Sequence, residues 1–188
     1  MVTPGAMVRG IFRWRTPARF IADRRGMSAV EFGMLLPFLV LIAFGTLEVS
    51  DGFAVKRKLT DITSTMGDLV AQSKVITNTD MANILDASSA IIWPYNGSTL
   101  KIIVSGITID ASSNAKVTWS DARNTTPLPV NAPYLLPPDL VVPNTFLVVA
   151  EITYTYTPTV AYVLSGDINM SDRFFLKPRL STTVLRTP

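Results

Sequence analysis

The side chain with the clearest chemical potential in this sequence is Glu31, a carboxylate near the front of an apolar run. No residue from Phe32 to Leu47 is charged, and with its mildly polar flanks the run extends from Met27 to Val49. A charged side chain inside a membrane helix is costly, so it usually indicates a partner or a function. Met27 precedes Glu31 by one helical turn. A cut between Gly26 and Met27 would create an amine that could pair with Glu31.

Other chemistry is limited by composition. The 188 residues include no cysteine and no histidine, which excludes thiolate catalysis, Cys-type zinc sites and a Ser-His-Asp triad. The remaining carboxylates and lysines form no recognisable catalytic constellation, so we expect neither an enzyme nor a cofactor. Five aspartates could in principle contribute to a calcium site: Asp110, Asp121, Asp139, Asp167 and Asp172. None shows the spacing of a known calcium loop, so we expect no metal site.

The positive charge is concentrated at the N-terminus. Residues 1–26 carry six arginines and one aspartate, a net charge of +5, whereas the remainder carries −2. Arg24 and Arg25 stand directly before the apolar run. Basic residues before a membrane helix keep that end in the cytoplasm, so we expect the C-terminal portion to be exported. Nothing later in the chain forms a basic face, and we expect no nucleic-acid partner.

The apolar run is long enough to cross a bilayer, whose hydrocarbon core needs about 20 helical residues. Two other readings are a buried helix of a soluble protein and a secretory signal with Ser50 and Gly52 before the cut. Pro37 removes one helical hydrogen bond and can kink the helix. Gly33 and Gly45 are small enough for close approach of another helix.

The segment around Glu31 resembles the type IV prepilin processing site, in which a glycine precedes the cut and glutamate is the fifth mature residue. The wider stretch from Arg24 to Phe53 resembles the TadE-like family, pseudopilins of the bacterial tight-adherence (Tad, Flp-type) pilus machinery. The matching elements are Arg25-Gly26, Ser28-Ala29, Val30-Glu31-Phe32, Leu36-Pro37, Gly45 and Glu48.

The resemblance implies that residues 1–26 are a removable cytoplasmic leader, held at the inner face by Arg24 and Arg25. The Gly26–Met27 bond would be cut by a prepilin peptidase, and Glu31 with Phe32 would serve in assembly or recognition. It implies other pilin and pseudopilin subunits, the inner-membrane assembly platform and the lipid bilayer as partners. Typical short Tad pilins end soon after the helix, whereas this chain continues for more than a hundred residues. The resemblance therefore favours a minor pilin or pseudopilin.

Residues 51–75 are predicted to extend the membrane helix of residues 27–50. Apolar residues recur there at helical spacing and form a stripe: Val55, Leu59, Ile62, Met66 and Leu69. This stripe could pack on the domain's own sheet or on neighbouring subunits. We expect Lys56-Arg57-Lys58 to form a solvated face.

Residues 76–188 are predicted to be an exported β-rich domain. We expect a short helix at Thr79–Ala90 with Asp80 as its N-cap. Strand patterns occur in LKIIVSGITID, in its hairpin partner KVTWS, in NTFLVVAEITYTY and in RLSTTVLR. Six prolines between Pro127 and Pro143 exclude a central strand or helix there. Tyr154 and Tyr156 are expected in the core. The order of these later segments also resembles, more loosely, the longer TadE-like proteins.

Together these patterns predict an α+β fold, with a long N-terminal helix whose first half spans the membrane and a small antiparallel sheet of about four strands. The expected function is assembly of a Tad-type pilus, by initiation, capping or incorporation. The alternative is an uncleaved single-pass anchor that displays an adhesive or scaffolding periplasmic domain. An anchored periplasmic enzyme would require a carboxylate or lysine constellation that the sequence does not show.

Overall fold

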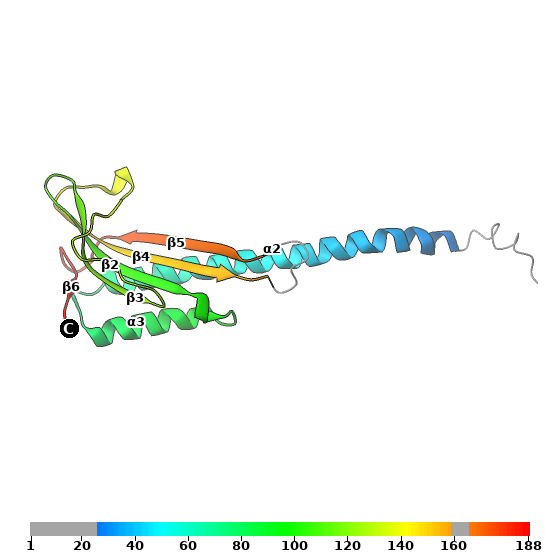
Figure 1. The fold of residues 1–188 in the computed structure, drawn as a ribbon, viewed down its shortest axis with the longest axis horizontal. Coiled ribbons are helices and arrows are strands. Elements are labelled where there is room, and N and C mark those ends of the chain that lie inside the picture. Colours follow the sequence, from blue (N-terminus) through cyan, green and yellow to red (C-terminus); the bar gives the residue numbers. More distant parts are fainter. Residues whose placement is uncertain (1–25, 159–165) are drawn as a thin grey trace, which may run out of the picture. The chain divides into compact units, whose positions relative to one another are not determined.

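A computed structural model describes residues 26–158 and 166–188 (Figure 1). The chain divides into two compact units at Ala43 and Phe44, and each is considered by itself. The α+β class is confirmed, because one long helix precedes a small antiparallel sheet.

The long helix is α2 (Met27–Ala71), which contains Pro37. In the first unit every described residue is exposed. In the second unit the helix buries the predicted stripe at Val55, Leu59, Ile62 and Met66. The prediction was wrong for Leu69, which is 41% exposed, whereas Val70 is fully buried. Val70 therefore takes the place predicted for Leu69, because it is Val70 that packs in the core with the sheet.

The second helix is α3 (Asn78–Ile91), close to the predicted bounds. Thr77, not Asp80, is its N-cap, so that part of the prediction was wrong. Asp80 is the third helical residue and completes a capping box: the Asp80 N–H donates to Thr77 Oγ1 at 3.2 Å, and the Thr77 N–H donates to Asp80 Oδ2 at 3.0 Å. This reciprocal pair satisfies two backbone donors that the helix itself cannot satisfy.

Four antiparallel strands form the main sheet in the order β3-β2-β4-β5 (Figure 1). They are β2 (Lys101–Ile109), β3 (Ala115–Arg123), β4 (Thr145–Tyr156) and β5 (Ile168–Leu176). The predicted β2–β3 hairpin and the strand β4 are confirmed. The fourth strand was predicted wrongly, because β5 holds that place and not the RLSTTVLR segment.

Only the end of RLSTTVLR is a strand. It forms β6 (Leu185–Arg186), which pairs in parallel with β1 (Val75–Ile76) in a separate two-stranded sheet. Two short 3-10 helices complete the described elements, η2 (Gly97–Thr99) and η3 (Pro138–Leu140).

The main sheet has a hydrophobic core on each face. One face packs on α2 and α3, where Ala150, Ile152, Tyr154 and Tyr156 of β4 are buried. Gly67 lets α2 approach this face closely, since a Cβ there would lie 2.5 Å from Leu176 Cδ1. The prediction that both tyrosines belong to the core is confirmed, with exposures of 3% and 4%.

The proline-rich segment, residues 127–143, covers part of the outer face. It contains η3 and otherwise runs as extended chain along the edge of β3, where the Val117 N–H donates to Ala132 O at 3.0 Å and the Tyr134 N–H donates to Ala115 O at 2.9 Å. Leu136 packs with Leu147 and Val149 in a second core. The segment therefore protects one edge of the sheet and leaves the other half of the outer face open.

Candidate functional site

The predicted processing site lies where α2 begins. Met27 is the first residue of the helix and is 57% exposed. Gly26 stands directly before it in open space, because a Cβ there would meet nothing within 4 Å. Arg24 and Arg25 lie outside the described residues. The two residues that flank the expected scissile bond, Gly26 and Met27, are thus both exposed.

Glu31 lies on α2 one helical turn after Met27, and its side chain is exposed. Phe32 beside it is 58% exposed. The neighbouring apolar side chains are exposed as well, including Val30, Met34 and Leu35 at 64%, 70% and 59%. A carboxylate among exposed apolar side chains needs a partner if the segment enters a bilayer.

The helix features predicted with Glu31 divide between the two units. Pro37 lies inside α2 in the first unit. Gly45 is half-buried and Glu48 is only 2% exposed, both in the second unit. The burial of Glu48 was not predicted. Burial raises the pKa of Tyr156, and the charges of Asp51, Tyr95 and Glu48 raise it further.

The basic cluster Lys56-Arg57-Lys58 was predicted to be a solvated face; Arg57 is exposed, whereas the two lysines are half-buried and hydrogen-bonded. Lys56 Nζ donates to the Ser171 carbonyl at 2.6 Å and to Asp172 Oδ1 at 3.1 Å. Lys58 Nζ donates to the carbonyls of Ile91 and Trp93 at 3.2 and 3.0 Å. The lysines therefore tie β5 and the end of α3 to α2, while Arg57 is exposed.

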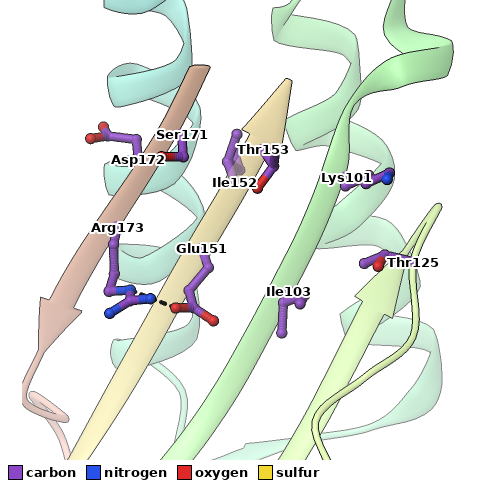
Figure 2. A pocket seen from close by; sticks show the side chains of 9 residues that line it. All are labelled: Lys101, Ile103, Thr125, Glu151, Ile152, Thr153, Ser171, Asp172 and Arg173. Atoms are coloured by element: carbon purple, nitrogen blue, oxygen red, sulfur yellow. Dashed lines mark ion pairs between the residues drawn. The ribbon is translucent and has the colours of Figure 1, made fainter. Parts of the chain in front are cut away.

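A cleft of about 560 Å³ lies on the open half of the outer sheet face, a site that sequence reasoning missed (Figure 2). Arg173 points along β5 toward Glu151 and pairs with it at 2.5 Å. Tyr134 donates to Glu151 Oε1 at 2.8 Å, and the Arg173 guanidinium lies 5.7 Å from the Tyr134 ring centre. Burial, then the bond to Glu151, raises the pKa of Tyr134 above its ordinary range.

This cleft does not assemble a reactive group. The Glu151 carboxylate is already engaged by the Arg173 guanidinium and the Tyr134 hydroxyl, both at Oε1. Lys101, at the start of β2, and Thr125, just after β3, line the far side of the cleft (Figure 2). Within residues 26–158 and 166–188 no group of three or more potential metal ligands is present. The cleft fits polar recognition better than catalysis.

The described part of the chain thus has an α+β unit and, at its N-terminal side, one helix long and apolar enough to cross a membrane. This combination fits a membrane-anchored protein. Residues 26–65 match the family model described as TadE-like protein, which confirms the resemblance over that segment. The match associates the chain with Tad pilus-related function, in a family of structural and assembly proteins not known as enzymes.

The family match begins at Gly26 and ends within α2, so the sheet and α3 lie outside it. The looser resemblance of the later segments therefore stays a prediction. Among curated proteins and among solved structures, none matches the chain.

Proposed function

We propose that the chain is a minor pilin or pseudopilin that takes part in assembling a Tad/Flp-type pilus after cleavage between Gly26 and Met27. The observation that carries the proposal is a coincidence of two boundaries. The family match starts at Gly26, and α2 starts at Met27. Cleavage there would release a helix whose first residue carries the new amine.

The membrane arrangement follows from charge and length. The first unit exposes large apolar side chains throughout its described part, as a bilayer-spanning segment does. The arginine-rich leader stays on the cytoplasmic side of the inner membrane, and the chain beyond the membrane-spanning part of α2 is exported. Residues 27–50 span the bilayer in this proposal, residues 51–75 extend beyond it, and residues 76–188 complete the exported domain.

Glu31 has a specific task in this arrangement. A bare carboxylate costs about 2.5–3.5 kcal/mol at the centre of a membrane helix and less near its end. The amine of a mature Met27, on the same chain or on a neighbour, would neutralise it. If the amine belongs to an incoming subunit, its ion pair with Glu31 would fix the axial position of that subunit's helix along α2. The ion pair would thereby guide helix bundling. Phe32 and Pro37 would shape the surface around that contact.

The test is N-terminal sequencing of the protein from membranes, with and without the cognate prepilin peptidase. We expect a start at Met27 that depends on the peptidase. A start at Met1 or Met7 in both strains would overturn the proposal and leave the uncleaved anchor. Gly26→Leu should block cleavage by adding bulk at the cut, whereas Gly33→Leu, at another glycine with nothing within 4 Å, should leave it unchanged.

A further inference from the structure

One end of the second unit presents two large aromatic side chains to the outside. Trp93 is 78% exposed and Phe53 is 73% exposed. They belong to one region, because Phe53 and Lys58 line the same shallow hollow of about 580 Å³ and Lys58 Nζ donates to the Trp93 carbonyl at 3.0 Å. Arg57 lines that hollow between them and is exposed.

The backbone that carries Trp93 is fixed on both sides. Its N–H donates to the Ala90 carbonyl at 3.3 Å, and its own carbonyl accepts from Lys58. Two residues later Tyr95 packs against the hydrophobic core of the unit. A fixed backbone keeps the amphipathic indole at this end of the unit, at the free-energy cost of leaving its apolar surface in water.

The same end of the unit continues the apolar surface of α2. Phe44, Leu47 and Val49 belong to the second unit and are 41%, 60% and 41% exposed. At 1.5 Å per helical residue, Phe53 lies about 6 Å beyond Val49 and Arg57 about 12 Å beyond it. The headgroup layer on each side of a bilayer is about 5–8 Å thick, so Phe53 lies at headgroup level if Val49 ends the hydrocarbon span. The backbone of Arg57 lies beyond that layer, but its long side chain can reach back to it, because helical side chains slant toward the helix N-terminus.

We propose that Phe53, Arg57, Lys58 and Trp93 form a lipid-contact surface that binds the headgroup region of the outer leaflet of the same membrane. The proposal rests on the membrane anchoring proposed above. Tryptophan favours this layer because its ring is apolar and its N–H is polar. Arg57 adds attraction to anionic phosphates, although Asp51 and Asp61 nearby weaken it. The aromatic contacts thus provide most of the binding and hold the exported domain against the membrane.

The test measures quenching of Trp93 by brominated lipids. The full chain carries Trp14, Trp93 and Trp119, so Trp14→Phe serves as background, and Trp119, 6% exposed and bonded to the Val184 carbonyl, is shielded. The chain is reconstituted at low density in phosphatidylcholine vesicles with phosphatidylglycerol. We expect bromine near the headgroup to quench more emission than bromine near the chain ends, and Trp93→Phe to remove that difference.

Leu135→Trp in the Trp93→Phe chain is the matched control. Leu135 is 89% exposed, and its neighbours Tyr134 and Leu136 pack beside the start of β4. Tyr95, by contrast, lies near Tyr154 at the end of β4. Leu136 packs on Leu147 and Val149, which precede Tyr154 on β4 by seven and five residues. That is roughly 17–23 Å of strand, so the new indole should lie farther from the membrane and should not be quenched.

The outcomes distinguish a failure of the anchoring from a failure of the lipid-contact surface alone. Flotation with the vesicles first establishes anchoring, and a chain that does not float overturns both the anchoring and this surface. A floating chain whose Trp93 is unquenched overturns the lipid-contact surface alone. A blue shift of the Trp93 emission that appears only at high protein density, without quenching, would show that a second copy of the chain covers Trp93. That result would also overturn the lipid-contact surface. Arg57→Gln should reduce the dependence of quenching on phosphatidylglycerol.

Discussion

Asp121 on β3 accepts two hydrogen bonds from the guanidinium of Arg186 on β6, from Nε at 2.8 Å and from Nη2 at 3.0 Å. The Arg186 side chain is 16% exposed, and the Asp121 side chain is 24% exposed. Arg186 Nη2 also donates to Asn78 Oδ1 at 2.6 Å. This one cation therefore joins the last strand to the main sheet and to the start of α3.

Arg186→Lys should destabilise the domain although it keeps the charge. Lysine cannot reproduce the two parallel N–H donors, and a hydrogen bond to a charged group contributes about 1.5–3 kcal/mol. We expect the free energy of unfolding of the full chain in detergent to fall by about 1–2 kcal/mol, measured by denaturant titration with circular dichroism. Arg173→Lys, at a more exposed pair, is the control and should cost less. Equal losses would contradict the role assigned to the C-terminal strand.

Gly106→Ala should destabilise the second unit by a different mechanism. An added Cβ would collide with the rings of Trp119 and Phe146. Both rings are buried, at 6% and 4% exposure, so they have little room to move, and overpacking of this kind costs about 1–3 kcal/mol. The measurement is the shift of the denaturation midpoint.

Gly52→Ala is the control for Gly106→Ala, and it should shift the denaturation midpoint in the opposite direction. Gly52 lies inside α2, and a Cβ there would meet only Met170 Cε, at 4.0 Å. Glycine within a helix costs about 0.5–1 kcal/mol relative to alanine, so this substitution should stabilise the chain. A loss at Gly52, or no loss at Gly106, would contradict the packing described.

The capping box of α3 should make stability depend on pH at the acidic end. Hydrogen bonds from the Thr77 side chain and backbone hold the pKa of Asp80 below its ordinary 3.8. A lowered folded pKa contributes stability that is complete above the unfolded pKa and is lost as pH falls through the folded value. Wild type should thus exceed Asp80→Asn in stability near neutral pH, and the gap should shrink below about pH 4. The measurement is thermal unfolding of both proteins across that pH range. A stability difference that does not change with pH would contradict the capping contribution.

The elements that the sequence predicted correctly are those with strong local periodicity. The stripe from Val55 to Met66 repeats at helical spacing, and the second half of β4 alternates, so burial there follows directly from the pattern. The processing segment is also contiguous, which is why its residues could be chosen without a structure. The sequence pattern indicated Asp80 as the N-cap of α3, whereas the backbone geometry assigns that position to Thr77.

The elements that were missed depend on contacts between distant residues. β5 carries Asp172 and Arg173 in its middle, which weakens its strand pattern. Those charges are satisfied by Lys56 on α2 and by Glu151 on β4. The cleft of Figure 2 depends on the same pairing, with Tyr134 added from the proline-rich segment. Such partners can be identified only after the chain has folded.

Glu31→Gln tests the pairing proposed for assembly. The amide has nearly the same shape but no charge, so it costs less to bury in a membrane and cannot attract the amine of Met27. We expect membrane insertion and cleavage at Gly26 to be retained while incorporation into pili falls. The measurements are fractionation for insertion, N-terminal sequencing for cleavage, and immunoblotting of sheared pili for incorporation.

Two further variants decide what a loss of pili in that experiment means. Glu31→Asp keeps the charge on a shorter side chain and should restore part of the incorporation, whereas a role for shape alone predicts that glutamine is tolerated better than aspartate. Ser28→Gln places the same amide elsewhere in the first turn of α2 and should leave incorporation unchanged. If pili assemble normally with Glu31→Gln, charge neutralisation at Glu31 does not guide helix bundling. In that case the selection of subunits would have to reside in apolar contacts along α2, beginning with the exposed Phe32.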